Sequence, residues 1–128
     1  MPDYFYGPQA EQFAFYRIPK ALFTDPAFRS ISTDAKALYG LLLDRMNLSA
    51  RNDWLDEQGR VYIVFTVEEI MESLACGNKK AVGLLRELEV GAGLIERRRQ
   101  GLGKPNLIYV KNFIEGNFLK CPNDTSVS

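Results

Sequence analysis

The sequence of 128 residues contains no histidine and only two cysteines, Cys76 and Cys121. Without histidine there is no Ser-His or Cys-His nucleophile pair, and two cysteines do not complete the usual tetrahedral zinc site. We expect Cys76 to be a small buried side chain and expect no disulfide in a reducing compartment. The composition therefore predicts a protein with no metal, no cofactor and no enzymatic activity.

Long apolar runs are also missing, and none approaches the ~18 residues of a membrane span. The N-terminus MPDYFYGPQA lacks the basic start and apolar stretch of a secretion signal. Apolar residues make up 46% and charged residues 25%, which is typical of a globular protein. We expect one cytoplasmic domain over residues 1–120, followed by a frayed tail or the start of a linker over residues 121–128.

The net charge is zero, but the two signs are not evenly distributed. Residues 1–78 hold seven basic and eleven acidic side chains, whereas residues 79–120 hold nine basic and four acidic ones. Such an asymmetry indicates either a surface that faces a polyanion or an ordinary solvated surface.

In QFAFYRI the side chains of Phe13, Phe15 and Arg17 alternate with those of Ala14, Tyr16 and Ile18. This pattern predicts a strand with an aromatic face over Gln12–Ile18, which Pro19 ends. PKALF fits one helical turn that begins at its proline, and TDPAF fits a turn. Apolar residues with helical spacing then predict a long, largely buried helix over Thr33–Leu48, with Asp34 in its first turn.

Trp54-Leu55 and the run Val61–Phe65 flank a glycine turn, which predicts a hairpin. TVEE is a capping box that begins a short helix. We expect Gly77 to be the left-handed residue that ends this helix, and Asn78 to be the N-cap of the next. The result is a helix, a tight turn and a second helix.

The second of these helices has a buried face made by Ala81, Leu84, Leu85 and Leu88. Gly83 on its other side indicates close approach of another backbone, which is either DNA or a neighbouring helix. LIERRR and LIYVKNF then predict a β-hairpin with a glycine-rich, basic tip.

This order of elements predicts an α+β fold, a winged helix-turn-helix with an additional N-terminal strand and β-hairpins, in which the second helix enters the DNA major groove. Lysines at that helix N-terminus suit phosphate, Arg86 is the expected base reader, and the basic hairpin is expected to reach the backbone or minor groove. The candidate DNA-binding residues are Asn78, Lys79, Lys80, Gly83, Arg86, Arg97, Arg98, Arg99 and Lys104.

The segments DAKALYGLLLDRM, WLDEQGRVYI and LGKPNLIYVKNF carry a resemblance to a known family. Over about Phe15 to Phe113 the chain resembles the N-terminal domain of replication initiator protein A of theta-replicating plasmids from Gram-positive bacteria. The resemblance implies a winged helix that binds repeated origin sites, called iterons, usually as a dimer. Longer members carry a C-terminal domain tied to host replication proteins, so we expect this chain to be an N-terminal fragment.

Two other functions use the same features. A winged helix repressor would differ only in the DNA that it binds, and a winged helix interaction module would bind protein instead, which the basic C-terminal half disfavours. Scattered carboxylates such as Asp44, Asp53 and Asp56 have no partner motif and are expected to be surface groups or caps.

The first fifteen residues are rich in aromatic side chains beyond the needs of one strand. We expect a homodimer whose subunit contact includes this segment, the alternative being that Phe13 and Phe15 belong to the core. The aromatic residues concerned are Tyr4, Phe5, Tyr6, Phe13 and Phe15.

Overall fold

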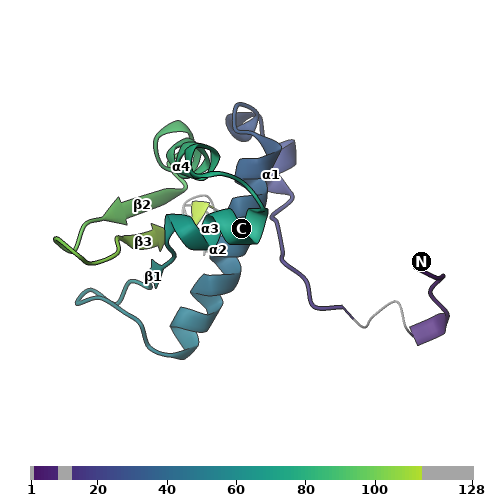
Figure 1. Ribbon diagram of the computed structural model, residues 1–128, viewed down its shortest axis with the longest axis horizontal. Coiled ribbons are helices and arrows are strands. Elements are labelled where there is room, and N and C mark those ends of the chain that lie inside the picture. Colours follow the sequence, from purple (N-terminus) through teal and green to yellow (C-terminus); the bar gives the residue numbers. More distant parts are fainter. Residues whose placement is uncertain (1, 9–12, 114–128) are drawn as a thin grey trace, which may run out of the picture.

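The computed structural model describes residues 2–8 and 13–113. Figure 1 shows its helices around one small sheet. The elements, in chain order, are α1 (Ala21–Thr24), the 3-10 turn η2 (Pro26–Phe28), α2 (Thr33–Arg51), β1 (Ile63–Val64), α3 (Val67–Leu74), α4 (Asn78–Arg86), the π-helical segment η3 (Glu87–Gly91), β2 (Ile95–Arg98) and β3 (Leu107–Val110). The predicted α+β class is confirmed. In the part of the chain that the structure describes, no helix is both long and apolar enough to span a bilayer.

Helix α2 forms the centre of the core and begins where the sequence predicts, but runs to Arg51 instead of Leu48. The Ser32 side chain caps its N-terminus by accepting from the backbone N–H of Ala35 at 3.1 Å. Tyr39 is almost fully buried and donates its hydroxyl to the carbonyl of Lys111 at 2.9 Å. Burial raises the pKa of Tyr39 to about 12, so this hydroxyl remains a donor at any ordinary pH.

The three strands form an antiparallel sheet in the order β1-β3-β2. Ile95 pairs with Val110 and Arg97 with Ile108, so the predicted hairpin β2–β3 is confirmed. Side chains alternate between the two faces of a strand. Ile95 and Ile108 therefore face the core, whereas Tyr109 belongs to the opposite face.

The capping box that begins α3 is confirmed, with the Thr66 side chain and Glu69 each receiving the other's backbone N–H. The two caps predicted between α3 and α4 are wrong, because other residues occupy these positions. Ala75 adopts the left-handed conformation, with φ 52°, and ends α3, while Gly77 is extended and is itself the N-cap of α4. The chain turns two residues earlier than glycine preference indicates, which leaves Asn78 as the first helical residue with an exposed side chain.

The predicted N-terminal strand is not formed over its described residues, 13–18, which are extended but pair with no other strand. Alternation alone predicts an extended chain, and a strand also needs a partner edge. This segment instead crosses α2 at Gly40, where an added Cβ would lie 2.9 Å from a side-chain carbon of Ile18. From Gly40 back toward the N-terminus, the segment extends away from the body of the domain (Figure 1). Gln12 lies outside the described residues.

The hairpin predicted around Gln58-Gly59 is formed only in part. Leu55 and Val61 make an isolated bridge, whereas β1 pairs with β3 instead. Asp56 holds the loop through hydrogen bonds to its carboxylate. It accepts from the backbone N–H and from Nε of Arg60, each at 2.8 Å, and from the Tyr109 hydroxyl at 3.1 Å. Partial burial raises the pKa of Asp56, but these hydrogen bonds outweigh it and lower the pKa to about 2. Asp56 is therefore a structural carboxylate.

Candidate nucleic-acid interface

Helix α4 separates its side chains into a buried face and an exposed stripe. Ala81, Leu84 and Leu85 are buried, and Leu88 continues this face into η3. Truncating one of these leucines to alanine would lower the free energy of unfolding by about 2–5 kcal/mol, so packing against the core strongly favours this orientation of the helix. The exposed stripe consists of Lys79, Val82, Gly83 and Arg86.

Gly83 has open space in place of a side chain, since no atom outside its own helix lies within 4 Å of an added Cβ. No neighbouring helix of the described chain therefore explains this glycine. Of the two explanations that the sequence leaves open, the neighbouring helix is therefore excluded for the described residues, and close approach of DNA stays a prediction.

Two polar contacts tie α4 and η3 to the first turn of α2. Lys80 forms an ion pair with Asp34, and this hydrogen bond is the main cause of the raised pKa of Lys80. Seven residues along, Glu87 accepts from the backbone N–H of Ser32 at 2.7 Å and from its hydroxyl at 3.0 Å. Both the first turn of α4 and the start of η3 therefore contact the N-terminus of α2, and Lys80 has an ion-pair partner at the surface.

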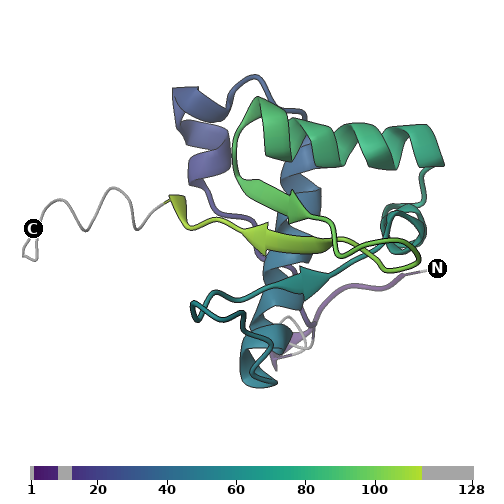
Figure 2. The same cartoon turned by 90° about the vertical axis from the view of Figure 1, so that its left-hand side faces the viewer.

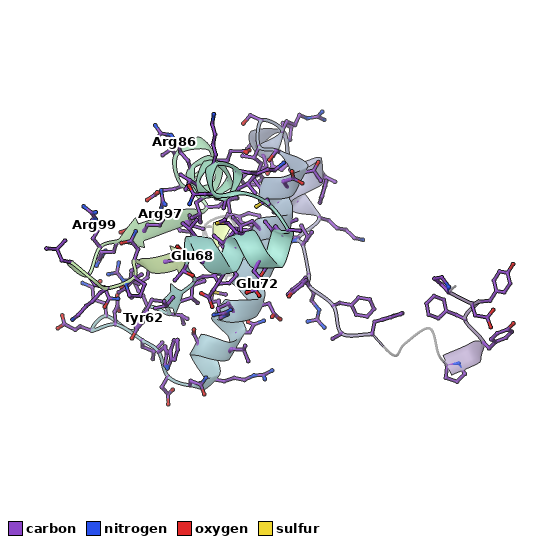
Figure 3. The ribbon with its side chains drawn as sticks, in the orientation of Figure 1. Tyr62, Glu68, Glu72, Arg86, Arg97 and Arg99 are labelled. Atoms are coloured by element: carbon purple, nitrogen blue, oxygen red, sulfur yellow. The ribbon has the colours of Figure 1, made fainter. Side chains whose placement is uncertain are left out.

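The hairpin arginines do not act as one cluster, because Arg97 and Arg98 lie on opposite faces of β2. Arg98 pairs with Glu96 at 3.0 Å and covers the Tyr109 ring at 5.1 Å. Arg97 lies on the side of the helices, and Figure 3 shows Arg97 and Arg99 extending from the hairpin toward α4, with Arg86 above them. Tyr62 lies on the other side of the sheet in the same view.

Arg97 is held by Glu89 of η3. One carboxylate oxygen accepts from Nε of Arg97 at 2.8 Å, and the other accepts from its backbone N–H at 3.1 Å. Both side chains are about a quarter exposed. Partial burial raises the pKa of Glu89, but the hydrogen bonds from Arg97 outweigh it and the net shift is downward.

A cleft of about 380 Å³ lies between α3, the start of α4 and the hairpin. Asn78, Arg97 and Lys104 line it together with Pro105 and Asn106. Figure 2 shows the reason, since α4 runs above the hairpin and roughly along it. Three of the sequence-predicted residues, Asn78 from the helix and Arg97 and Lys104 from the hairpin, thus meet at one place. Lys79, Lys80 and Gly83 instead line a separate hollow of about 510 Å³ between α4 and the start of α2.

Ion pairs divide the predicted cations into two groups. In residues 2–8 and 13–113, Lys80, Arg97 and Arg98 are paired. Within the same residues, no ion pair is formed by Lys79, Arg86, Arg99 or Lys104. These four exposed charges can neutralise an external anion without first losing an internal partner.

The exposed face of α3 carries Glu68 and Glu72, which Figure 3 shows on the outside of that helix. Glu68 also lines the cleft beside Asn78, so the cleft is basic on the hairpin side and acidic on the α3 side. A polyanion would be repelled by the α3 side.

Sequence reasoning missed two residues of this site. Val82 could have been found from its place in the α4 stripe, where it is 41% exposed, but the contact of Glu89 with Arg97 carries no sequence signal.

Comparison with known families decides what kind of domain this is. The model of the family described as replication initiator protein A N-terminus matches residues 14–120, which is most of the chain. The chain belongs to this family. The match includes both α4 and the hairpin, so the basic surface lies within the family domain.

A curated relative of this family domain is a "41 kDa protein" from Lactobacillus helveticus, which is 30% identical over 108 residues. The match takes in 84% of this chain but only 30% of that relative, so the chain spans less than a third of its length.

Solved structures resemble the domain over nearly all of its length. One described as the N-terminal domain of a DNA-binding protein is 38% identical, with a TM-score of 0.71 over 88% of this chain and 85% of the other. A Rep-DNA complex gives the same identity and TM-score over 86% and 84%. An MDR initiator is 35% identical, with a TM-score of 0.68 over 86% of both chains.

Proposed function

We propose that this domain is the sequence-specific DNA-binding part of a plasmid replication initiator and that it recognises repeated origin sites in duplex DNA. The observation that carries the proposal is that α4 and the hairpin lie next to one another, with Asn78 of α4 and Arg97 and Lys104 of the hairpin lining one cleft. Family membership and the likeness to a Rep-DNA complex support it. The domain acts by binding in the cytoplasm and not by catalysis.

In this proposal the domain is a winged helix, with α4 in the major groove and the hairpin as the wing. Lys79 at the start of α4 contacts phosphate, where the helix dipole adds to its charge. Arg86 reads a guanine edge, and Val82 contacts a thymine methyl group. Gly83 allows the α4 backbone to approach the groove, and Asn78 lies at its entrance.

The hairpin supplies the second set of contacts. Arg99 and Lys104 are exposed and close to the tip, and neither forms an ion pair with another described residue, so they reach the backbone or the minor groove beside the α4 site. Lys80 and Arg98 contribute less, since each would have to leave a carboxylate partner.

We also propose that the domain acts as a homodimer through its N-terminal segment. Phe13 and Phe15 are 50% and 68% exposed, so core packing does not account for them. Phe5 and Phe13 meet edge to face at 5.6 Å, which forms an exposed aromatic cluster. Such a patch is stabilised when a second copy covers it. Host replication proteins are partners of a C-terminal domain in the whole protein.

Footprinting on the origin that accompanies the gene tests the function. We expect protection at several copies of one repeat, with binding to a scrambled duplex at least about 10³-fold weaker. Protection of a single promoter site without repeats would indicate a repressor instead. Absence of protection at any site, with the protein folded by circular dichroism, would contradict DNA recognition.

A further inference from the structure

The Glu89–Arg97 pair stands at the junction of the two basic elements. Glu89 comes from η3, directly after α4, and Arg97 comes from the middle of β2. The carboxylate takes only the Nε side of the guanidinium and the Arg97 backbone N–H. Among the described residues, neither terminal nitrogen of Arg97 forms a hydrogen bond, and this side chain lines the cleft together with Asn78 and Lys104.

We propose that Glu89 is a positioning residue for DNA recognition, which fixes the Arg97 guanidinium so that its terminal nitrogens face the DNA. The inference rests on the proposed function. Arg97 is then a pre-oriented DNA ligand, and its pairing with Glu89 is part of the recognition site instead of a loss of one cation.

The need for such a role follows from the charge of Glu89. A carboxylate beside a phosphate-binding surface repels the polyanion, and an ion pair that is partly exposed adds little to stability. Holding the planar guanidinium of Arg97 in a fixed orientation compensates for that repulsion, because the side chain then loses less conformational entropy when DNA binds.

A second carboxylate, Glu96 of β2, lies on the face of the sheet away from α4. It accepts one hydrogen bond from Arg98 at 3.0 Å, and its other oxygen lies 3.6 Å from Nζ of Lys111. The three side chains are at least 40% exposed. Glu96 is therefore a control for charge, since its neutralisation removes one negative charge from a group that, like its two partners, does not line the cleft.

The test compares Glu89→Gln with Glu96→Gln by fluorescence anisotropy on the preferred origin duplex. Simple electrostatics predicts that both substitutions tighten binding, since each removes a negative charge. The positioning role predicts that Glu89→Gln weakens binding about fivefold, the lower end of what one bidentate contact contributes. If Glu89→Gln binds as tightly as Glu96→Gln or tighter, the proposal is wrong.

A second variant, Arg97→Lys, keeps the charge but removes the planar fork. We expect it to weaken binding by a similar factor, and expect Glu89→Gln to add no further loss in that background. Independent, multiplicative losses from the two substitutions would contradict the proposal. Thermal unfolding by circular dichroism shows that each variant is folded.

A measurement without DNA separates this inference from the proposed function. In ¹H–¹⁵N spectra of the free protein, the Nε–H signal of Arg97 should exchange slowly with water, and Glu89→Gln should abolish that protection. If the wild-type protein binds no duplex, the proposed function fails, and the spectra still decide whether Glu89 holds Arg97. Equal exchange in both proteins would overturn the clamp itself.

Discussion

The division of the basic residues into paired and unpaired cations predicts how single substitutions change the salt dependence of DNA binding. Lys79 and Lys80 are neighbours at the start of α4, but only Lys80 has an ion-pair partner, Asp34. We expect Lys79→Ala to reduce the number of ions released on binding. Lys80→Ala should leave that number unchanged, although it weakens binding by exposing Asp34 to the phosphates.

The magnitude follows from the cations that are unpaired in the described part of the chain, of which Lys79, Arg99 and Lys104 are assigned to phosphate and Arg86 to a guanine edge. At ~0.9 ions released per phosphate contact, three contacts give a slope of log affinity against log salt of about −2.7 per domain, so affinity falls about 40-fold between roughly 50 and 200 mM salt. Lys79→Ala should bring the slope to about −1.8, which corresponds to a fall of about 12-fold over the same range.

Anisotropy titrations at five salt concentrations, on a duplex with one half-site, measure both slopes for a single domain. Circular dichroism of each variant is the control for folding. Equal slopes for the wild type and Lys79→Ala would refute the placement of α4 on the phosphates. A slope for Lys80→Ala that is less steep than that of the wild type would show that the ion pair with Asp34 opens when DNA binds. The division into paired and unpaired cations would then be wrong.

Further predictions concern the bases, the dimer and the loop. Arg86→Ala should cost about 1–3 kcal/mol on the preferred duplex and little on random DNA, and equal losses on both in parallel titrations would exclude base reading. Deoxyuridine in place of the contacted thymine should weaken DNA binding by the wild type but not by Val82→Ala. If the base change and the Val82→Ala substitution weaken binding additively, Val82 does not contact the methyl group. Replacing Phe13 and Phe15 together by serine should turn a dimer into a monomer in light scattering, and a wild type that is already monomeric would contradict the dimer. Asp56 has a pKa of about 2, lowered from 3.8. Its stabilising effect should therefore be complete above about pH 4 and be lost as the pH falls toward 2, so the difference in melting temperature between wild type and Asp56→Asn should shrink over that range. A constant difference would show that its charge is not what fastens the loop.

Local patterns determined most of the elements. The spacing of Ala81, Leu84 and Leu85 fixes which face of α4 is buried, because an amphipathic helix has only one apolar face to place in a core. The capping box at Thr66 and the hairpin β2–β3 were likewise predictable, since both depend on residues close together in the chain. The basic residues of α4 and of the hairpin could be named for the same reason.

Partners that are distant in the sequence decided the rest. Residues 13–18 alternate like a strand, but they lie against α2 at Gly40 and pair with neither of the edge strands, β1 and β2. Alternation carries no information about which element a segment will contact, so this placement could not be predicted. Glycine preference predicted the turn after α3 at Gly77, whereas Ala75 is the left-handed residue and donates its backbone N–H to the carbonyl of Met71.

A helix with an exposed basic stripe followed by a basic hairpin can be recognised in the sequence, because periodicity and turn residues are local properties. Which of those charges are available depends on contacts between residues that are distant in the chain. Arg97 and Arg98 are adjacent and identical in type, but strand alternation sends one to Glu89 beside the cleft and the other to Glu96 on the far face. The reason is physical: the field at a charge depends on what lies within a few ångströms of it, and those neighbours are brought there by the fold.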